Sequence, residues 1–240
     1  MNAKVWMFVS GVTTEFEEVD FDYSEYLGPD YKKHYNNKIN TSTVISNHVS
    51  WHDTMNIWQF IECSFSLDMS FKNDVLMGNL AKVNDSIFIP RGGSDEQRAK
   101  AIKIISDRQD EIEKTGKYNP LLVFPEGCTT NGSSLLKFKK GAFSSLKRVT
   151  PIVMIYDLGT SVSVAFDIME VVPLSILNLS WAGMRCKIIK LPDIYPTEFM
   201  YTRKEAQGLE KWEAFAEVVR EVMSKASGLP KSDLTFPQKR

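Results

Sequence analysis

Residues 47–53 read NHVSWHD and bring two of the chain's three histidines, a carboxylate and an amide into seven positions. If a strand ends near Asn47 and a helix begins near Asp53, the turn between them can fold the Asp53 carboxylate onto the imidazole of His48. The carboxylate would then fix the tautomer and leave the other ring nitrogen as a base. The spacing is equally compatible with a helix N-cap at Asp53 beside a turn histidine.

A zinc site is the second chemistry that these histidines allow. His48 and His52 are four residues apart, which suits two ligands on one helix. No HExxH sequence is present, however, and the third histidine, His34, stands in a polar stretch. A third ligand would have to be an unidentified carboxylate or cysteine. We therefore expect no metal, and we expect His52 to be a packing or turn residue.

A second group of polar residues follows LLVFP at residues 121–125, a short apolar run that is typical of a buried strand. The residues that come after it are Glu126, Gly127, Cys128, Thr129, Thr130 and Asn131. Small residues and hydroxyls at such a turn can direct N–H and O–H donors at an anion, but an ordinary polar turn has the same composition. The segment taken alone leaves both interpretations open.

Two further features could serve the same site. Arg91 follows the run SIFIP and could meet a phosphate with its planar fork of donors, although most such arginines are solvated. Lysines in LLKFKKGAF, at 137, 139 and 140, could add positive potential, although a short basic run is more often a solvated face. The apolar run at residues 171–184 is too short to span a bilayer, so it is either a core element or a membrane-interface segment.

Strands and helices alternate along the predicted fold. Strands are predicted over residues 41–46, 86–90, 121–125, 150–156 and 186–192. Helices are predicted over residues 54–64, from a capping box at Ser94 to Gly116, and over residues 204–226. This order implies an α/β fold with a largely parallel or mixed central sheet flanked by helices. The candidate segments all follow strands, and the carboxyl ends of strands are where such sheets place their chemistry.

Composition excludes some partners and compartments. The chain has 240 residues, of which 43% are hydrophobic and 25% are charged, and its net charge is −1. No basic excess exists to meet a nucleic-acid backbone, so no nucleic acid is expected. The three cysteines are widely spaced and odd in number, which favours a reducing compartment over a disulfide framework.

Taken together, these segments resemble the glycerophospholipid acyltransferase family over about residues 40–225. NHVSWHD resembles the family's NHxxxxD block, SIFIPR the second block, FPEG at residues 124–127 the third and TPIV the weaker fourth, in the family's order. FPEGCTTNG followed by FKKGAF looks closest to the lysophosphatidylcholine and lysophosphatidylethanolamine acyltransferase branch. That branch usually has Thr where this chain has Cys128.

The resemblance implies an acyltransferase-domain fold and a reaction. A fatty acyl group would pass from acyl-CoA to the free hydroxyl of a lysophospholipid or glycerol phosphate, with His48 as general base oriented by Asp53. Acyl-CoA would be a co-substrate, and neither a cofactor nor a metal would be needed. The substrate-binding residues that it implies are Arg91, Glu126, Gly127, Cys128, Thr129 and Asn131.

The resemblance also implies a location. The protein is expected at a membrane surface, in the endoplasmic reticulum and facing the cytosol, with residues 171–184 as a possible contact. Residues 1–40 are expected to be an N-terminal segment left from a membrane-associated region. Residues 41–225 would form the acyltransferase domain and residues 226–240 a tail.

Two other functions remain open. Cys128, His48 and Asp53 could form a cysteine triad in a thioesterase or lipid hydrolase, although the GxSxG sequence of serine hydrolases is absent. A non-catalytic lipid-binding domain could also keep this fold. Binding alone has no use for a base, so the His48 and Asp53 pair favours an enzyme.

Overall fold

Seven strands form one sheet in the computed structural model, which describes residues 12–34, 40–75, 77–90, 94–157 and 184–234. Their order is β1-β7-β6-β2-β5-β3-β4, and neighbours run parallel except β6 and β7. The strands are β1 (Val12–Glu18), β2 (Thr43–Ser46), β3 (Ser64–Asp68), β4 (Ile87–Ile89), β5 (Leu121–Val123), β6 (Val149–Asp157) and β7 (Met184–Lys190). The predicted α/β fold with a mixed sheet is confirmed.

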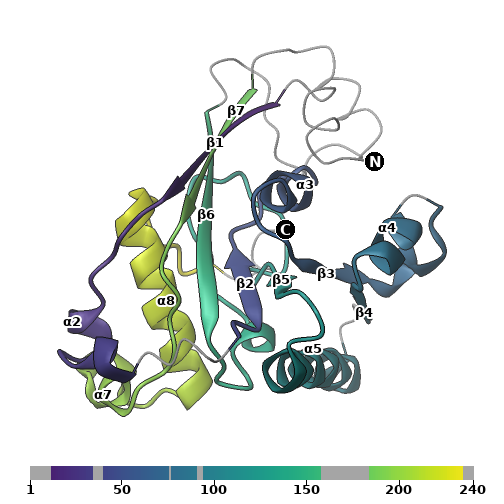
Figure 1. Cartoon of the computed structure of the whole chain (residues 1–240). Helices are drawn as coiled ribbons and strands as arrows, with labels where there is room; N and C mark the ends of the chain where they lie inside the picture. Colours follow the sequence, from purple (N-terminus) through teal and green to yellow (C-terminus); the bar gives the residue numbers. More distant parts are fainter. Residues whose placement is uncertain (1–11, 35–39, 76, 91–93, 158–183, 235–240) are drawn as a thin grey trace.

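Helices flank this sheet, and Figure 1 shows α8 running beside β6. The α-helices are α2 (Ser24–Leu27), α3 (Asp53–Trp58), α4 (Met77–Val83), α5 (Asp95–Thr115), α7 (Glu198–Thr202) and α8 (Lys211–Ser227). Short 3₁₀ helices are η1 (Tyr31–His34), η2 (Met69–Asn73), η3 (Lys140–Ala142) and η4 (Lys204–Ala206). The caps predicted for α5 are present: the Ser94 hydroxyl accepts from the Gln97 N–H, and Gly116 ends the helix at φ +61°.

The central strands are buried on both faces. Val44 of β2 and Leu122 of β5 pack in a cluster with Ile57 of α3. Their neighbours Ile45 and Leu121 belong to the other cluster, which α5 and α8 supply with side chains. Because successive strand residues point to opposite faces, burial on both sides requires unbroken apolar runs. This explains why the sequence of these strands shows no polar alternation.

Two predicted helices differ from the structure. The helix expected over residues 54–64 ends at Trp58, and residues 64–68 form β3 between β5 and β4. The helix expected over residues 204–226 begins only at Lys211 because Gly208, at φ +81°, interrupts the backbone after η4. Strand β1 was not predicted, since its sequence VTTEFEE carries the charges of an edge strand that pairs on one side.

The two ends of the described chain belong to the same packed unit as its middle. Residues 12–34, assigned above to an N-terminal segment, contribute β1 to the sheet and Tyr23 and Tyr26 to the core. After α8, the chain returns to Leu135, whose N–H donates to the Pro230 carbonyl. Strand β2 lies between β5 and β6, so the carboxyl ends of these three parallel strands lie together.

Candidate active site

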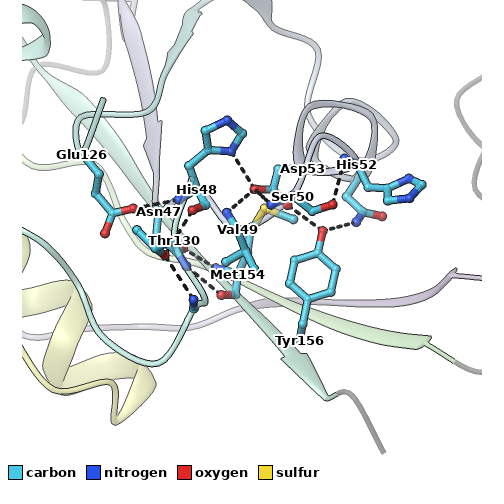
Figure 2. Close-up of polar contacts among 12 residues, drawn as sticks. Asn47, His48, Val49, Ser50, His52, Asp53, Glu126, Thr130, Met154 and Tyr156 are labelled. Carbon is cyan, nitrogen blue, oxygen red and sulfur yellow. Dashed lines mark hydrogen bonds and ion pairs between the residues drawn. The ribbon is translucent and has the colours of Figure 1, made fainter. Parts of the chain in front are cut away.

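His48 and Asp53 meet at the end of β2. The Nδ1 of His48 lies 2.9 Å from Oδ2 of Asp53, as Figure 2 shows. Helix α3 begins at Asp53 and its N-cap is His52, so Asp53 does not itself occupy the cap position. The predicted contact across the turn is therefore confirmed. With Nδ1 donating to the carboxylate, Nε2 is the nitrogen that can accept a proton.

Asp53 is fully buried, and backbone donors surround its carboxylate. Oδ2 accepts from the N–H groups of Val49 (2.6 Å) and Ser50 (2.9 Å) as well as from the imidazole. Held in this way, the carboxylate fixes the His48 tautomer and would stabilise the imidazolium that forms when Nε2 takes a proton.

The turn after β5 holds the backbone of His48. Oε2 of Glu126 accepts from the His48 N–H (3.0 Å), and Oε1 accepts from the Leu136 N–H (2.9 Å). On the other side, the N–H and the hydroxyl of Thr130 donate to the His48 carbonyl, at 2.7 and 3.2 Å. Glu126 and Thr130 are both buried. The segments NHVSWHD and PEGCTTN are thus joined through the main chain of the histidine.

The imidazole of His48 rests on an aromatic ring. Phe124 stacks on it with 3.9 Å between ring centroids and 9° between ring planes. The His48 side chain is 17% exposed, whereas that of Asp53 is inaccessible. One edge of the imidazole is therefore anchored in the protein while part of the ring remains open to a substrate.

Asn47 ties the start of this turn to β6. Its Nδ2 donates to the Met154 carbonyl (2.9 Å), and its Oδ1 accepts from the Met154 N–H (2.8 Å). The amide side chain thus pairs with one residue in the way that a neighbouring strand would. This pairing fixes where β2 ends and the turn begins.

The other residues predicted to bind substrate have different surroundings. Gly127 adopts φ +71°, and the side chain of Lys139 lies across it: a Cβ at Gly127 would be 2.5 Å from Nζ. Cys128 and Thr129 are half-buried in the same turn, and Asn131 is exposed, accepting from the Ser133 N–H. Arg91 and most of the apolar run 171–184 lie outside the described residues.

Of the lysines that could add positive potential, Lys139 lies at the turn. Lys140 forms an ion pair with Glu210 (3.1 Å), and Lys137 lies 3.9 Å from Asp233. Lys139 is the lysine of this run whose side chain lies beside Gly127.

His52 is buried in an apolar setting that differs from that of His48. It is 1% exposed and packs on Trp51, with 3.8 Å between ring centroids. Within the described part of the chain, neither ring nitrogen has a hydrogen-bond partner. Burial lowers the pKa of His52 to about 4, although the charge of Asp53 opposes this. The prediction that His52 is a packing residue is confirmed.

The histidines are not arranged as a zinc site. Figure 2 shows the rings of His48 and His52 pointing away from each other. Among the described residues, no group of three or more His, Cys, Asp or Glu side chains converges as metal ligands would. No helix within the described ranges is long and apolar enough to cross a membrane.

Sequence reasoning missed Tyr156. The phenol of this β6 residue donates to Oδ1 of Asp53 at 2.6 Å. The two residues are 103 positions apart in sequence, and the parallel pairing of β2 with β6 brings them together. Thr130 was noted in the turn but given no role. No local signal distinguishes either residue, because each contact depends on the placement of strands.

Comparison with known proteins assigns a family. The Acyltransferase family model matches residues 30–162, which is more than half of the chain. The 1-acyl-sn-glycerophosphate (LPA) acyltransferase PlsC from Thermotoga maritima, a solved structure, has a TM-score of 0.47 and 15% identity over 94% of this chain and 77% of its own. Residues 30–162, which the family model matches, include both NHVSWHD and FPEG.

Three curated relatives are 26–30% identical to the chain over the aligned residues. Lysophospholipid acyltransferase LPEAT1 of Arabidopsis thaliana is 27% identical over 82% of this chain and 47% of its own length. Lysophosphatidylcholine acyltransferase 1 of Danio rerio is 26% identical over 79% and 34%, and lysophosphatidylcholine acyltransferase of Drosophila melanogaster is 30% identical over 67% and 28%. The chain spans less than half the length of these relatives.

Proposed function

The chain belongs to the acyltransferase family, and we propose that it transfers a fatty acyl group from acyl-CoA to the free hydroxyl of a lysophospholipid or glycerol phosphate. The observation that carries this proposal is the contact between His48 and Asp53 beside the turn that follows β5. The dyad offers a base with a defined tautomer, and Lys139 brings positive charge to the turn, as a phosphate-bearing acceptor would need.

The reaction needs a base because an alcohol is a poor nucleophile at neutral pH. Nε2 of His48 takes the hydroxyl proton as the acceptor oxygen bonds to the thioester carbonyl carbon. The tetrahedral intermediate then collapses, the carbon–sulfur bond breaks, and the CoA sulfur receives the proton from the imidazolium. General base catalysis of this kind contributes about 10²–10⁴-fold to the rate.

The acceptor is proposed to lie over the turn that follows β5. The Lys139 side chain brings positive charge to Gly127, where it occupies the space that a side chain at Gly127 would need. Gly127, Cys128, Thr129, Asn131 and Arg91 are the proposed contacts. Glu126 binds backbone N–H groups through both oxygens, which supports a role in shaping the turn beside the acceptor.

The names of the relatives favour a lysophospholipid as the acceptor, since LPEAT1 is called a lysophospholipid acyltransferase and two others are lysophosphatidylcholine acyltransferases. Such an acceptor resides in a lipid layer. We therefore propose that the protein works at a membrane surface, in the endoplasmic reticulum with this domain facing the cytosol, and that residues 171–184 contact the lipid. Acyl-CoA would reach the site from the aqueous side.

Acceptor-dependent release of CoA tests this function. CoA is followed with a thiol reagent while acyl-CoA is supplied alone or with lysophosphatidylcholine, lysophosphatidylethanolamine, lysophosphatidate or glycerol phosphate. We expect release only with an acceptor, and loss of that release in His48→Gln. Release without any acceptor would instead support the thioesterase in which Cys128 acts with His48. No release with any acceptor would support a lipid-binding domain.

A further inference from the structure

The two carboxylate oxygens of Asp53 have unequal partners. Oδ2 receives the imidazole and two backbone N–H groups, whereas Oδ1 receives the phenol of Tyr156 at 2.6 Å. A carboxylate can rotate about its terminal bond, and such terminal torsions are broad. A donor at Oδ1 limits this rotation and keeps Oδ2 directed at Nδ1 of His48.

The phenol is itself held by a chain of hydrogen bonds from two other elements. Nδ2 of Asn56, on α3, donates to the Tyr156 oxygen at 2.9 Å. The hydroxyl of Thr14, on β1, donates to Oδ1 of Asn56 at 2.8 Å. Because the phenol oxygen accepts from Asn56, its proton is directed at Asp53. The chain therefore runs in one direction, from the edge of the sheet to the dyad.

The protonation states around Asp53 support this direction. Burial, and then the charge of Asp53, raises the pKa of Tyr156 well above its ordinary value, so the phenol stays protonated and donates. Cys186 of β7 is the register partner of Tyr156, and burial and the Asp53 charge raise the pKa of its thiol as well. His52, next to Asp53, is neutral above about pH 4. Glu126 faces the backbone of His48 and not the Asp53 carboxylate.

We propose that Tyr156 is a positioning residue for the dyad: its hydroxyl holds the Asp53 carboxylate in the orientation that keeps the His48 proton on Nδ1. The proposal rests on the proposed function for its effect on rate, but its effect on the His48 tautomer requires no substrate. Tyr156 acts through Asp53 and does not touch the reacting atoms. Thr14 and Asn56 in turn fix the direction of the phenol proton.

The test compares Tyr156→Phe with a matched variant, Tyr23→Phe. Tyr23 is fully buried, and its hydroxyl donates to the Pro192 carbonyl at 2.7 Å, whereas Tyr156 is partly buried. Each change removes one phenol hydroxyl that donates to an oxygen acceptor and keeps the ring. The nitrogen spectrum of the imidazoles can be read directly because the chain has three histidines, at 34, 48 and 52. Thermal unfolding verifies that both variants are folded.

In the neutral imidazole of the wild type, we expect His48 to carry its proton on Nδ1. In Tyr156→Phe we expect some of the molecules to carry the His48 proton on Nε2 instead. We also expect kcat to fall about tenfold, which corresponds to a loss of about 1.4 kcal/mol of transition-state stabilisation. The KM values for acyl-CoA and for the acceptor should change by less than about twofold, since Tyr156 contacts neither. Tyr23→Phe should leave the tautomer and kcat at wild-type values.

The proposal is overturned if Tyr156→Phe keeps the wild-type His48 tautomer and the kcat of Tyr23→Phe. It is also overturned if the two variants change the imidazole spectrum equally, because that would be a general effect of lost stability. A different result would show that the proposed function is wrong. The wild type would then transfer no acyl group to any acceptor, but Tyr156→Phe would still change the tautomer of His48.

Discussion

His48 and His52 are four residues apart in sequence but have different surroundings. Nδ1 of His48 lies 2.9 Å from Oδ2 of Asp53 and the side chain is partly exposed, so its imidazole can exchange a proton with a substrate. His52 is enclosed beside Trp51, and its ring nitrogens have no hydrogen-bond partner in the described part of the chain. A buried polar group without a hydrogen-bond partner costs free energy. The imidazole of His52 therefore gains packing contacts but loses its hydration.

The buried imidazole of His52 is expected to make the free energy of unfolding depend on pH. Its pKa is about 4 in the folded protein and near 6.5 in the unfolded chain, so the unfolded state binds more protons between these values. Folding stability therefore falls as the pH drops from 6.5 towards 4, by about 3 kcal/mol for this group. His52→Leu removes that dependence and leaves the dyad intact.

Urea unfolding of the wild type and of His52→Leu at pH 7.5 and pH 4.5 measures this effect. We expect the variant to gain about 2–3 kcal/mol relative to the wild type between the two pH values. The activity of His52→Leu at pH 7.5 should stay within about threefold of the wild type, which corresponds to about 0.6 kcal/mol in activation free energy. A difference in unfolding free energy that does not vary with pH would contradict the buried, neutral state of His52.

At the scale of elements, the site is made by two loops that follow adjacent parallel strands. Strand β2 ends at Ser46 and β5 ends at Val123, and the two pair in register. Glu126 then links the backbone of His48 to that of Leu136. The loop after β5 therefore supports the loop that carries His48, the proposed base, and it is also the proposed acceptor site.

Glu126→Gln tests this link. The amide that replaces one oxygen cannot accept from a backbone N–H, so one of the two contacts is lost and one N–H faces a second donor. We expect the free energy of unfolding to fall by about 2 kcal/mol and kcat to fall with it, because the His48 backbone is no longer held. The exposed Glu62→Gln is the matched control, with an expected change below about 0.5 kcal/mol.

Urea unfolding and steady-state kinetics on both variants decide the role of Glu126. If stability is unchanged in Glu126→Gln but the KM for the acceptor rises, Glu126 binds substrate directly and the proposed support of the His48 backbone is wrong.

The elements that the sequence predicted correctly are those with a local signal. The strands β2, β5 and β6 are apolar runs, and α5 is marked at both ends by Ser94 and Gly116. Strand β3, with the sequence SFSLD, was missed because it follows α3 after a short connection and carries no clear boundary. The contact between His48 and Asp53 was predicted because both residues lie in one turn. The contact with Tyr156 depends on strand register, which no short segment encodes.

At the scale of the whole molecule, the segment after α8 supports the loop after β5. Leu135 donates its N–H to the Pro230 carbonyl and accepts from the Ser232 N–H, both at 2.9 Å. The buried Arg220 of α8 donates to the Ser232 carbonyl at 2.9 Å. Leu135 precedes Leu136, the residue whose N–H binds Glu126. The far end of the described chain is thus connected with the candidate active site through a few hydrogen bonds to the backbone.

Truncation after Gly228 removes these three hydrogen bonds. Each contributes about 1 kcal/mol, so we expect the free energy of unfolding to fall by about 3 kcal/mol, and Arg220 loses a buried acceptor. Truncation after residue 234 keeps the three bonds and is the control, with an expected change below about 0.5 kcal/mol. Equal stabilities for the two truncated chains, measured by urea unfolding, would show that the segment does not support the loop.

The central claim is that His48, oriented by Asp53, drives direct acyl transfer to an acceptor hydroxyl. The most direct measurement counts acylated acceptor by mass spectrometry against CoA released, for the wild type, His48→Gln and Cys128→Ala. We expect one acylated acceptor per CoA in the wild type and in Cys128→Ala, and a loss of about 10²–10⁴-fold in His48→Gln. Product formation that persists in His48→Gln, or an acyl group found on Cys128 together with no turnover in Cys128→Ala, would contradict the account.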